Sequence, residues 1–143
     1  MLQQASCEQF STRTVADHAG WRALVESARA ISHARMLVAV VSTSCQYCID
    51  SMGFYRTLLD ASQHSSGRWH FVLAAAEPTD TLRRLASAHG LSTARLISFS
   101  LASSDIRQTP TLAVVDADGN IERVWGGVLP RASEDAVRAQ MER

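Results

Sequence analysis

The order of apolar segments predicts an α/β fold with three layers, in which helices cover both faces of a central mixed sheet. Two continuous apolar runs, 36–41 and 69–76, are typical of strands buried on both faces, and helix-like segments separate them. Strands joined through helices run parallel, whereas the closely spaced strands predicted at 110–115 and 121–125 must form an antiparallel hairpin. This order of strands and helices, with a last helix after the hairpin, predicts a mixed sheet with helices on both faces.

The first half of the chain changes from polar to strongly patterned. Residues 1–15 are expected to form a flexible N-terminal segment with a short strand at 12–15, followed by a single domain over 16–143. A helix is predicted over 20–32, since apolar residues recur there at helical spacing: Trp21, Leu24, Val25, Ala28 and Ile31. The strand 36–41 follows. The next helix has an inward stripe that consists of Cys48, Met52, Tyr55 and Leu59.

The second half continues the alternation. The composition of 62–68 predicts a loop before the strand at 69–76. A helix follows Pro78 and ends at Gly90, with Leu82, Leu85, Ala86 and His89 on one face. The remaining predictions are a short strand at 96–99, a loop at 102–108, a strand that starts at Pro110, a turn at 116–120, its partner strand at 121–125 and a helix at 133–141.

Composition narrows the class of protein. Of 143 residues, 46% are hydrophobic and 20% charged, and 14 basic residues balance 14 acidic ones, so neither nucleic acid nor an anionic membrane is an expected partner. All basic residues are arginine, which excludes lysine-based chemistry. No apolar stretch approaches the length of a membrane span, and no secretory leader is recognisable. The chain is therefore expected to be cytoplasmic unless an export signal was removed.

Two cysteines carry the chemistry that the sequence predicts. Cys45 and Cys48 follow an apolar strand and a short polar turn, at the point where a helix is predicted to begin. The partial positive charge at a helix N-terminus stabilises a thiolate, and the thiolate is the reactive form of cysteine. Cys48 belongs to the inward face of the helix, so Cys45 is expected to be the more exposed sulfur. The alternative is a pair of structural cysteines.

Together with a second motif, this pair resembles the thioredoxin superfamily and its redoxin group. The matching residues are Cys45-Gln46-Tyr47-Cys48, Thr109-Pro110 and the following hairpin with its Asp118-Gly119 turn. The resemblance spans nearly the whole chain and implies a thioredoxin-like three-layer α/β/α sandwich. It also implies a cis peptide bond before Pro110 that lies against the cysteine pair, so that the backbone of Thr109 can bind an extended substrate segment.

The resemblance further implies the roles of the site residues. Cys45 would attack a disulfide and Cys48 would resolve the mixed disulfide, with Thr109, Pro110, Gln46 and Tyr47 in contact with the substrate. No cofactor is expected besides a redox-active Cys45–Cys48 disulfide, and no metal. The expected partners are a protein thiol or disulfide substrate and a redox partner. The protein itself is expected to be a monomer. The resemblance is to bacterial members of the family, and it favours a periplasmic or extracytoplasmic location if an export signal was removed.

Three departures from the family pattern indicate a specialised oxidoreductase rather than a general reductant. Ser44 stands where a tryptophan usually precedes the first cysteine, and Gln46-Tyr47 replaces Gly-Pro between the cysteines. Ala39 stands where thioredoxins carry a buried acid on the preceding strand.

Two other functions use the same cysteines. A redoxin-type peroxidase would attack peroxide with Cys45, but such enzymes carry a threonine three residues earlier, where this chain has Ser42. A metal-delivery module would bind Cu(I) through both thiolates, although the histidines have no metal-like spacing to the pair. Cys7 is expected to be a free thiol rather than a lipid-attachment site.

Overall fold

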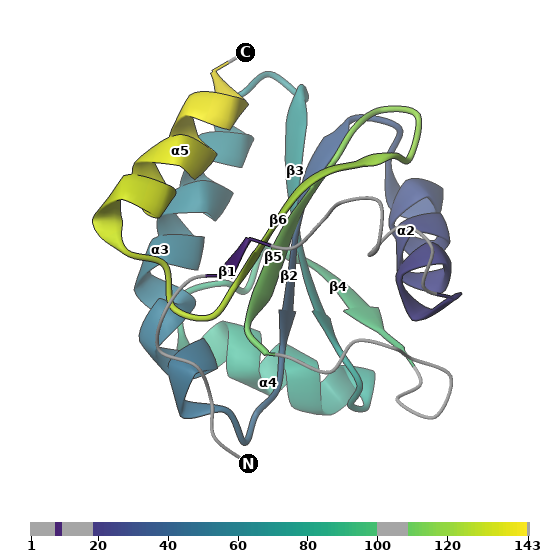
Figure 1. Cartoon of the computed structure of the whole chain (residues 1–143). Helices are drawn as coiled ribbons and strands as arrows, with labels where there is room; N and C mark the ends of the chain where they lie inside the picture. The colour runs from purple at the N-terminus through teal and green to yellow at the C-terminus, as the bar shows by residue number, and fades with distance from the viewer. Residues whose placement is uncertain (1–7, 10–18, 100–108, 143) are drawn as a thin grey trace.

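The computed structural model describes residues 8–9, 19–99 and 109–142 (Figure 1). Its centre is a six-stranded sheet with the strand order β1-β6-β5-β2-β3-β4. The strands are β1 (Glu8–Gln9), β2 (Arg35–Val41), β3 (Trp69–Ala75), β4 (Arg95–Ser98), β5 (Thr111–Val115) and β6 (Ile121–Gly126). β2, β3 and β4 are parallel, whereas β5 is antiparallel to β2 and forms a hairpin with β6. The predicted mixed sheet is confirmed.

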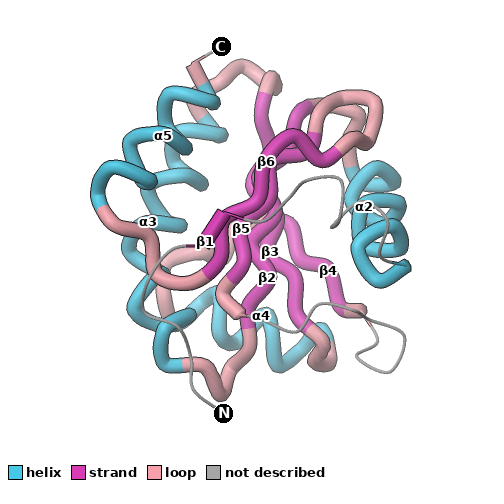
Figure 2. Tube along the Cα trace, viewed as in Figure 1, coloured by secondary structure: helices cyan, strands magenta, loops and turns pink. Residues whose placement is uncertain are grey.

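Helices cover both faces of this sheet, as Figures 1 and 2 show. The helices in the described residues are α2 (Ala19–Ile31), α3 (Gln46–Gln63), α4 (Thr79–Ala88) and α5 (Arg131–Met141). Side chains from α3, α4 and α5 share one core cluster with one face of the sheet, while α2 packs on the other face. The three-layer α/β/α arrangement is therefore confirmed.

The apolar run of β2 lacks alternation because both of its faces are buried. Leu37, Ala39 and Val41 point into the core beneath α3, whereas Met36, Val38 and Val40 point toward α2. β2 lies between β3 and β5, so no edge of it meets solvent. This places the C-terminal end of β2, and the cysteine pair that follows, at the middle of the sheet.

Most predicted elements match within two residues. α3 continues to Gln63, into the start of the predicted loop 62–68, and α5 begins at Arg131 rather than residue 133. β4 occupies 95–98 instead of 96–99, where it pairs in register with β3. The two-residue β1 was not predicted; it pairs with β6 at the sheet edge. The predicted strand at 12–15 and the loop at 102–108 lie outside the described residues, and the division into a flexible start and one domain stays a prediction.

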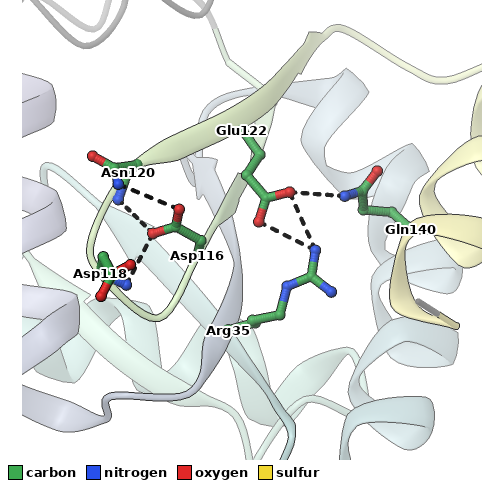
Figure 3. A network of polar contacts seen from close by, with 6 residues as sticks. All are labelled: Arg35, Asp116, Asp118, Asn120, Glu122 and Gln140. Atoms are coloured by element: carbon green, nitrogen blue, oxygen red, sulfur yellow. Dashed lines mark hydrogen bonds and ion pairs between the residues drawn. The ribbon is translucent and has the colours of Figure 1, made fainter.

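A polar network joins the sheet to α5 (Figure 3). The carboxylate of Glu122 on β6 accepts hydrogen bonds from Arg35 on β2 at 3.1 and 3.2 Å and from Gln140 on α5 at 3.0 Å. The Arg35 guanidinium also lies 4.3 Å from the centre of the Trp69 ring. These contacts fasten the closing helix to two strands.

The side chain of Asp116 stabilises the hairpin turn. Its carboxylate accepts the backbone N–H groups of Asp118 at 2.9 Å and Asn120 at 2.8 Å (Figure 3). Gly119 has φ +89, a left-handed conformation that glycine adopts without strain. The predicted turn is confirmed. Within the part of the chain that the structure describes, no helix is long and apolar enough to cross a membrane.

Candidate functional site

The cysteine pair lies where β2 passes into α3. After β2, the loop 42–45 closes in a turn in which the Cys45 N–H donates to the Ser42 carbonyl at 3.2 Å. Cys45 is the N-cap of α3, and its sulfur accepts the backbone N–H of Cys48 at 3.1 Å. The first N–H groups of a helix have no partner within the helix, and a side chain at the N-cap usually supplies one. Here the acceptor is the sulfur itself.

Both cysteines are buried. Cys45 is 2% exposed and Cys48 is fully buried, and both are free thiols. Cys45 is the more exposed of the two sulfurs, as predicted. The difference is small, however, and Cys45 is not exposed at the tip of the helix. The reason is the capping contact, which turns the Cys45 sulfur inward toward the helix instead of outward from its tip.

The second predicted motif lies against the first. The peptide bond between Thr109 and Pro110 is cis, as the resemblance implied. The Cys45 thiol donates to the carbonyl of Thr109 at 3.5 Å across a separation of 64 residues. Pro110 is buried and its carbonyl accepts the Gly127 N–H at 2.8 Å, which anchors the start of β5. The fold thus brings Cys45, Cys48, Thr109 and Pro110 together.

The two residues between the cysteines have different environments. Gln46 is exposed, and its amide donates to the Asp50 carboxylate at 2.9 Å, along the outer face of α3. Tyr47 is half-buried and packs against the core cluster beneath α3. Their predicted contact with a substrate stays a prediction.

Electrostatics distinguish Cys48 from its neighbour. Burial raises the pKa of the Cys48 thiol well above its usual range, and a hydrogen bond with Cys45 and the negative charge of a Cys45 thiolate raise it further. Contacts with the Ser42 backbone and with Thr109 oppose this rise only in part. Cys48 therefore keeps its proton near neutral pH.

A buried phenol lies behind the pair. Tyr55 follows Cys48 by seven residues on the inward stripe of α3 and is 2% exposed. Burial raises its pKa well above the usual range, and a thiolate at Cys48 or Cys45 would raise it further, so its hydroxyl stays protonated. Ala39, at the position of the missing acid, is fully buried in the same core cluster.

Sequence reasoning missed Glu77. Its carboxylate accepts the backbone N–H of Thr43 at 2.8 Å and the Ser42 hydroxyl at 3.3 Å, in the loop that leads to Cys45. One sequence signal could have indicated it: parallel strands β2 and β3 end at the same edge, with Val41 opposite Ala75. A polar residue just after either strand therefore lies beside this loop.

The described residues contain no group of three or more histidine, cysteine, aspartate or glutamate side chains arranged to hold a metal ion. His70, on β3, is half-buried. Partial burial lowers its pKa, and so does the charge of Arg95. Cys7 lies outside the described residues.

Comparison with known proteins gives a fold but no sequence relative. No protein-family model matches the chain, and neither does any curated protein sequence. Among solved structures, a putative thioredoxin from Neisseria meningitidis is similar with a TM-score of 0.62 and 14% identity, over 78% of this chain and 76% of that one.

Two further solved structures are similar, and the first is named as an oxidoreductase. A secreted Mycobacterium tuberculosis disulfide oxidoreductase homologous to E. coli DsbE matches at TM-score 0.59 and 15% identity, over 80% of this chain and 84% of that one. StoA from Bacillus subtilis matches at TM-score 0.59 and 16% identity, over 78% and 84%. This protein therefore has the thioredoxin-like fold.

Proposed function

We propose that the protein is a thiol–disulfide oxidoreductase that acts on protein substrates through Cys45 and Cys48. The observation that carries the proposal is the asymmetric pair at the start of α3. One sulfur accepts the helix N–H at 3.1 Å beside Thr109, and the other is buried with a raised pKa. Similar folds in other proteins are named thioredoxin and disulfide oxidoreductase, in agreement with this chemistry.

In the reducing direction, the Cys45 thiolate attacks one sulfur of a substrate disulfide. A bond forms between Cys45 and that sulfur, and the other substrate sulfur leaves as a thiolate that takes up a proton. Cys48 then loses its proton and attacks the Cys45 sulfur, which releases the second substrate thiol. The substrate gains two electrons and the pair becomes a disulfide. The reverse sequence oxidises a dithiol substrate.

The raised pKa of Cys48 supports this order of steps. While Cys45 is a thiolate, its charge and its hydrogen bond keep the proton on Cys48. Both effects disappear when the Cys45 sulfur enters the mixed disulfide, so Cys48 becomes easier to deprotonate only when it is needed. This change in the surroundings of Cys48 supports Cys45 as the attacking sulfur and Cys48 as the resolving one.

The same geometry supports a protein substrate. A protein segment in extended form could pair with the backbone at Thr109, where the Pro110 ring leaves no N–H to compete. Gln46 and Tyr47, on the first turn of α3, would contact the same segment. A second redox protein restores the pair after each turnover, and the Cys45–Cys48 disulfide takes the place of a cofactor.

The test uses the full chain with Cys7→Ser, so that only the pair reacts. Reduction of insulin disulfides by thiol reductant is expected to be accelerated, and Cys45→Ser is expected to abolish the acceleration. Cys48→Ala should accumulate a mixed disulfide on Cys45, which intact-mass spectrometry detects. Cys48→Ala in a Cys45→Ser background is the matched control and should trap nothing.

Three results would contradict the proposal. Faster alkylation of Cys48 than of Cys45 would reverse the assigned roles. Consumption of peroxide without any effect on insulin would favour the peroxidase. Retention of one Cu(I) per chain through gel filtration, without disulfide exchange, would favour metal delivery.

A further inference from the structure

The side chain of Glu77 connects the end of β3 to the loop before the reactive cysteine. Its Oε1 atom accepts from the Thr43 N–H at 2.8 Å and from the Ser42 hydroxyl at 3.3 Å. These partners lie 34 and 35 residues away in sequence. The carboxylate therefore fixes two neighbouring loops to each other at the C-terminal edge of the parallel strands.

Ser42 is the junction between Glu77 and the sulfurs. Its carbonyl accepts the Cys45 N–H at 3.2 Å, and its backbone acts to lower the pKa of Cys48 against the larger effect of burial. Its hydroxyl lies 3.0 Å from that of Ser44 and accepts the Ser44 N–H at 3.3 Å. A displacement of Ser42 would therefore change the surroundings of both cysteines.

Stability does not explain why the other carboxylate oxygen of Glu77 is buried. Oε2 is buried and has no hydrogen-bond partner in the described part of the chain. A buried polar atom without a partner destabilises a fold, so its presence calls for another reason. The Glu77 carbonyl, which accepts from the Ser98 hydroxyl, anchors the backbone of the residue to β4.

Nearby acidic side chains make other contacts. Asp50 binds Gln46 on the outer face of α3, and Asp80 pairs with Arg83 at 2.9 Å on the exposed face of α4. Neither of these contacts involves the loop 42–45. They show that an acid close in sequence does not by itself meet the loop.

We propose that Glu77 is a positioning residue for the dithiol. By accepting from Thr43 and Ser42, it holds the loop so that the Cys45 sulfur stays between the Cys48 N–H and the Thr109 carbonyl. The inference rests on the proposed function only in that the dithiol is reactive. Glu77 touches neither sulfur in the contacts described, so it acts through the loop and takes no part in the bond changes.

The experiment compares four variants of the full chain, all with Cys7→Ser. Glu77→Ala removes the acceptor, whereas Glu77→Gln keeps an oxygen that can accept the same two bonds. Ser42→Ala removes the hydroxyl contacts with Glu77 and Ser44 but keeps the Thr43 N–H bond to Glu77, and it remains available for the measurement if Glu77→Ala does not fold. Asp80→Asn is the matched control, since it changes an acidic charge three residues away without touching the loop.

The main readout is the rate at which iodoacetamide alkylates Cys45 in the reduced, folded protein. We expect Glu77→Ala to slow it about fivefold, the effect of losing roughly one hydrogen bond. Ser42→Ala should slow it about twofold, while Glu77→Gln and Asp80→Asn should leave the rate unchanged from that of the parent. The redox potential against glutathione should shift for Glu77→Ala and stay unchanged for Asp80→Asn.

Several outcomes would overturn the inference. An unchanged alkylation rate and potential in Glu77→Ala, with only a lower urea midpoint, would make Glu77 a purely structural residue. Equal slowing by Asp80→Asn would indicate general charge, and Glu77→Gln as slow as Glu77→Ala would exclude the acceptor role. Alkylation needs no disulfide substrate, so failure of the insulin assay alone would overturn the proposed function and leave this inference standing.

Discussion

The raised pKa of Cys48 predicts that the reduced protein loses stability in alkaline solution. In the unfolded chain, a cysteine thiol ionises near pH 8.5, about its ordinary pKa. In the folded protein, burial holds the Cys48 proton to much higher pH. Above about pH 8.5 the unfolded state therefore releases a proton that the folded state keeps, and ionisation stabilises the unfolded state.

The size of the effect follows from this difference. The stabilisation is fully present below about pH 8 and falls by about 1.4 kcal/mol per pH unit above the unfolded pKa. Between pH 7.5 and pH 10 the loss from Cys48 amounts to about 2 kcal/mol. The loss ends only where pH passes the folded pKa, beyond the range of the experiment.

Urea unfolding under a thiol-free reductant measures this loss at several pH values. The comparison is between the Cys7→Ser protein and the same protein with Cys48→Ala, because groups shared by both largely cancel. The difference in unfolding free energy between the two should shrink by about 2 kcal/mol from pH 7.5 to pH 10. A difference that stays constant over this range would refute the argument that Cys48 is protonated in the folded state.

Three further predictions concern the scaffold. Leu58→Ala should lower the free energy of unfolding by about 2–5 kcal/mol in urea titration, because Leu58 is fully buried on the inward face of α3. A loss under 1 kcal/mol would mean that the core refills the space. Glu122→Gln should lower the free energy of unfolding by about 1–2 kcal/mol, because Arg35 loses its charged partner while Gln140 keeps an acceptor. Adding 0.5 M salt should lower the free energy of unfolding of the parent more than that of the variant. Gly119→Ala should cost about 1 kcal/mol, as φ +89 suits glycine alone, whereas Gly53→Ala in open space within α3 should be neutral or stabilising.

The sequence allows the fold to be predicted because its main signals are local. An apolar run bounded by polar residues defines β2, and helical spacing from Trp21 to Ile31 defines α2 to within one residue. The Asp116–Asn120 turn defines the hairpin through the preference of its residues for tight turns. These patterns reflect burial on one or two faces, which each segment encodes by itself.

Contacts between distant segments are harder to predict. β1 has two residues and therefore no periodicity, and only its pairing with β6 makes it a strand. The contact of Glu77 with Thr43 depends on the rotamer of a side chain across two loops. The near-complete burial of Cys45 has the same origin, because its sulfur turns toward a backbone N–H that the spacing of the motif does not reveal.

The sulfur of Cys45 is also the atom that caps the first turn of α3, where it accepts the Cys48 N–H. Any bond that this sulfur forms with a substrate changes its ability to accept the Cys48 N–H, so chemistry at the site alters the first turn of the helix. The exchange rate of that single amide hydrogen should therefore differ between the reduced and the substrate-linked protein. A backbone amide in the core would then report the chemical state of the site without any label.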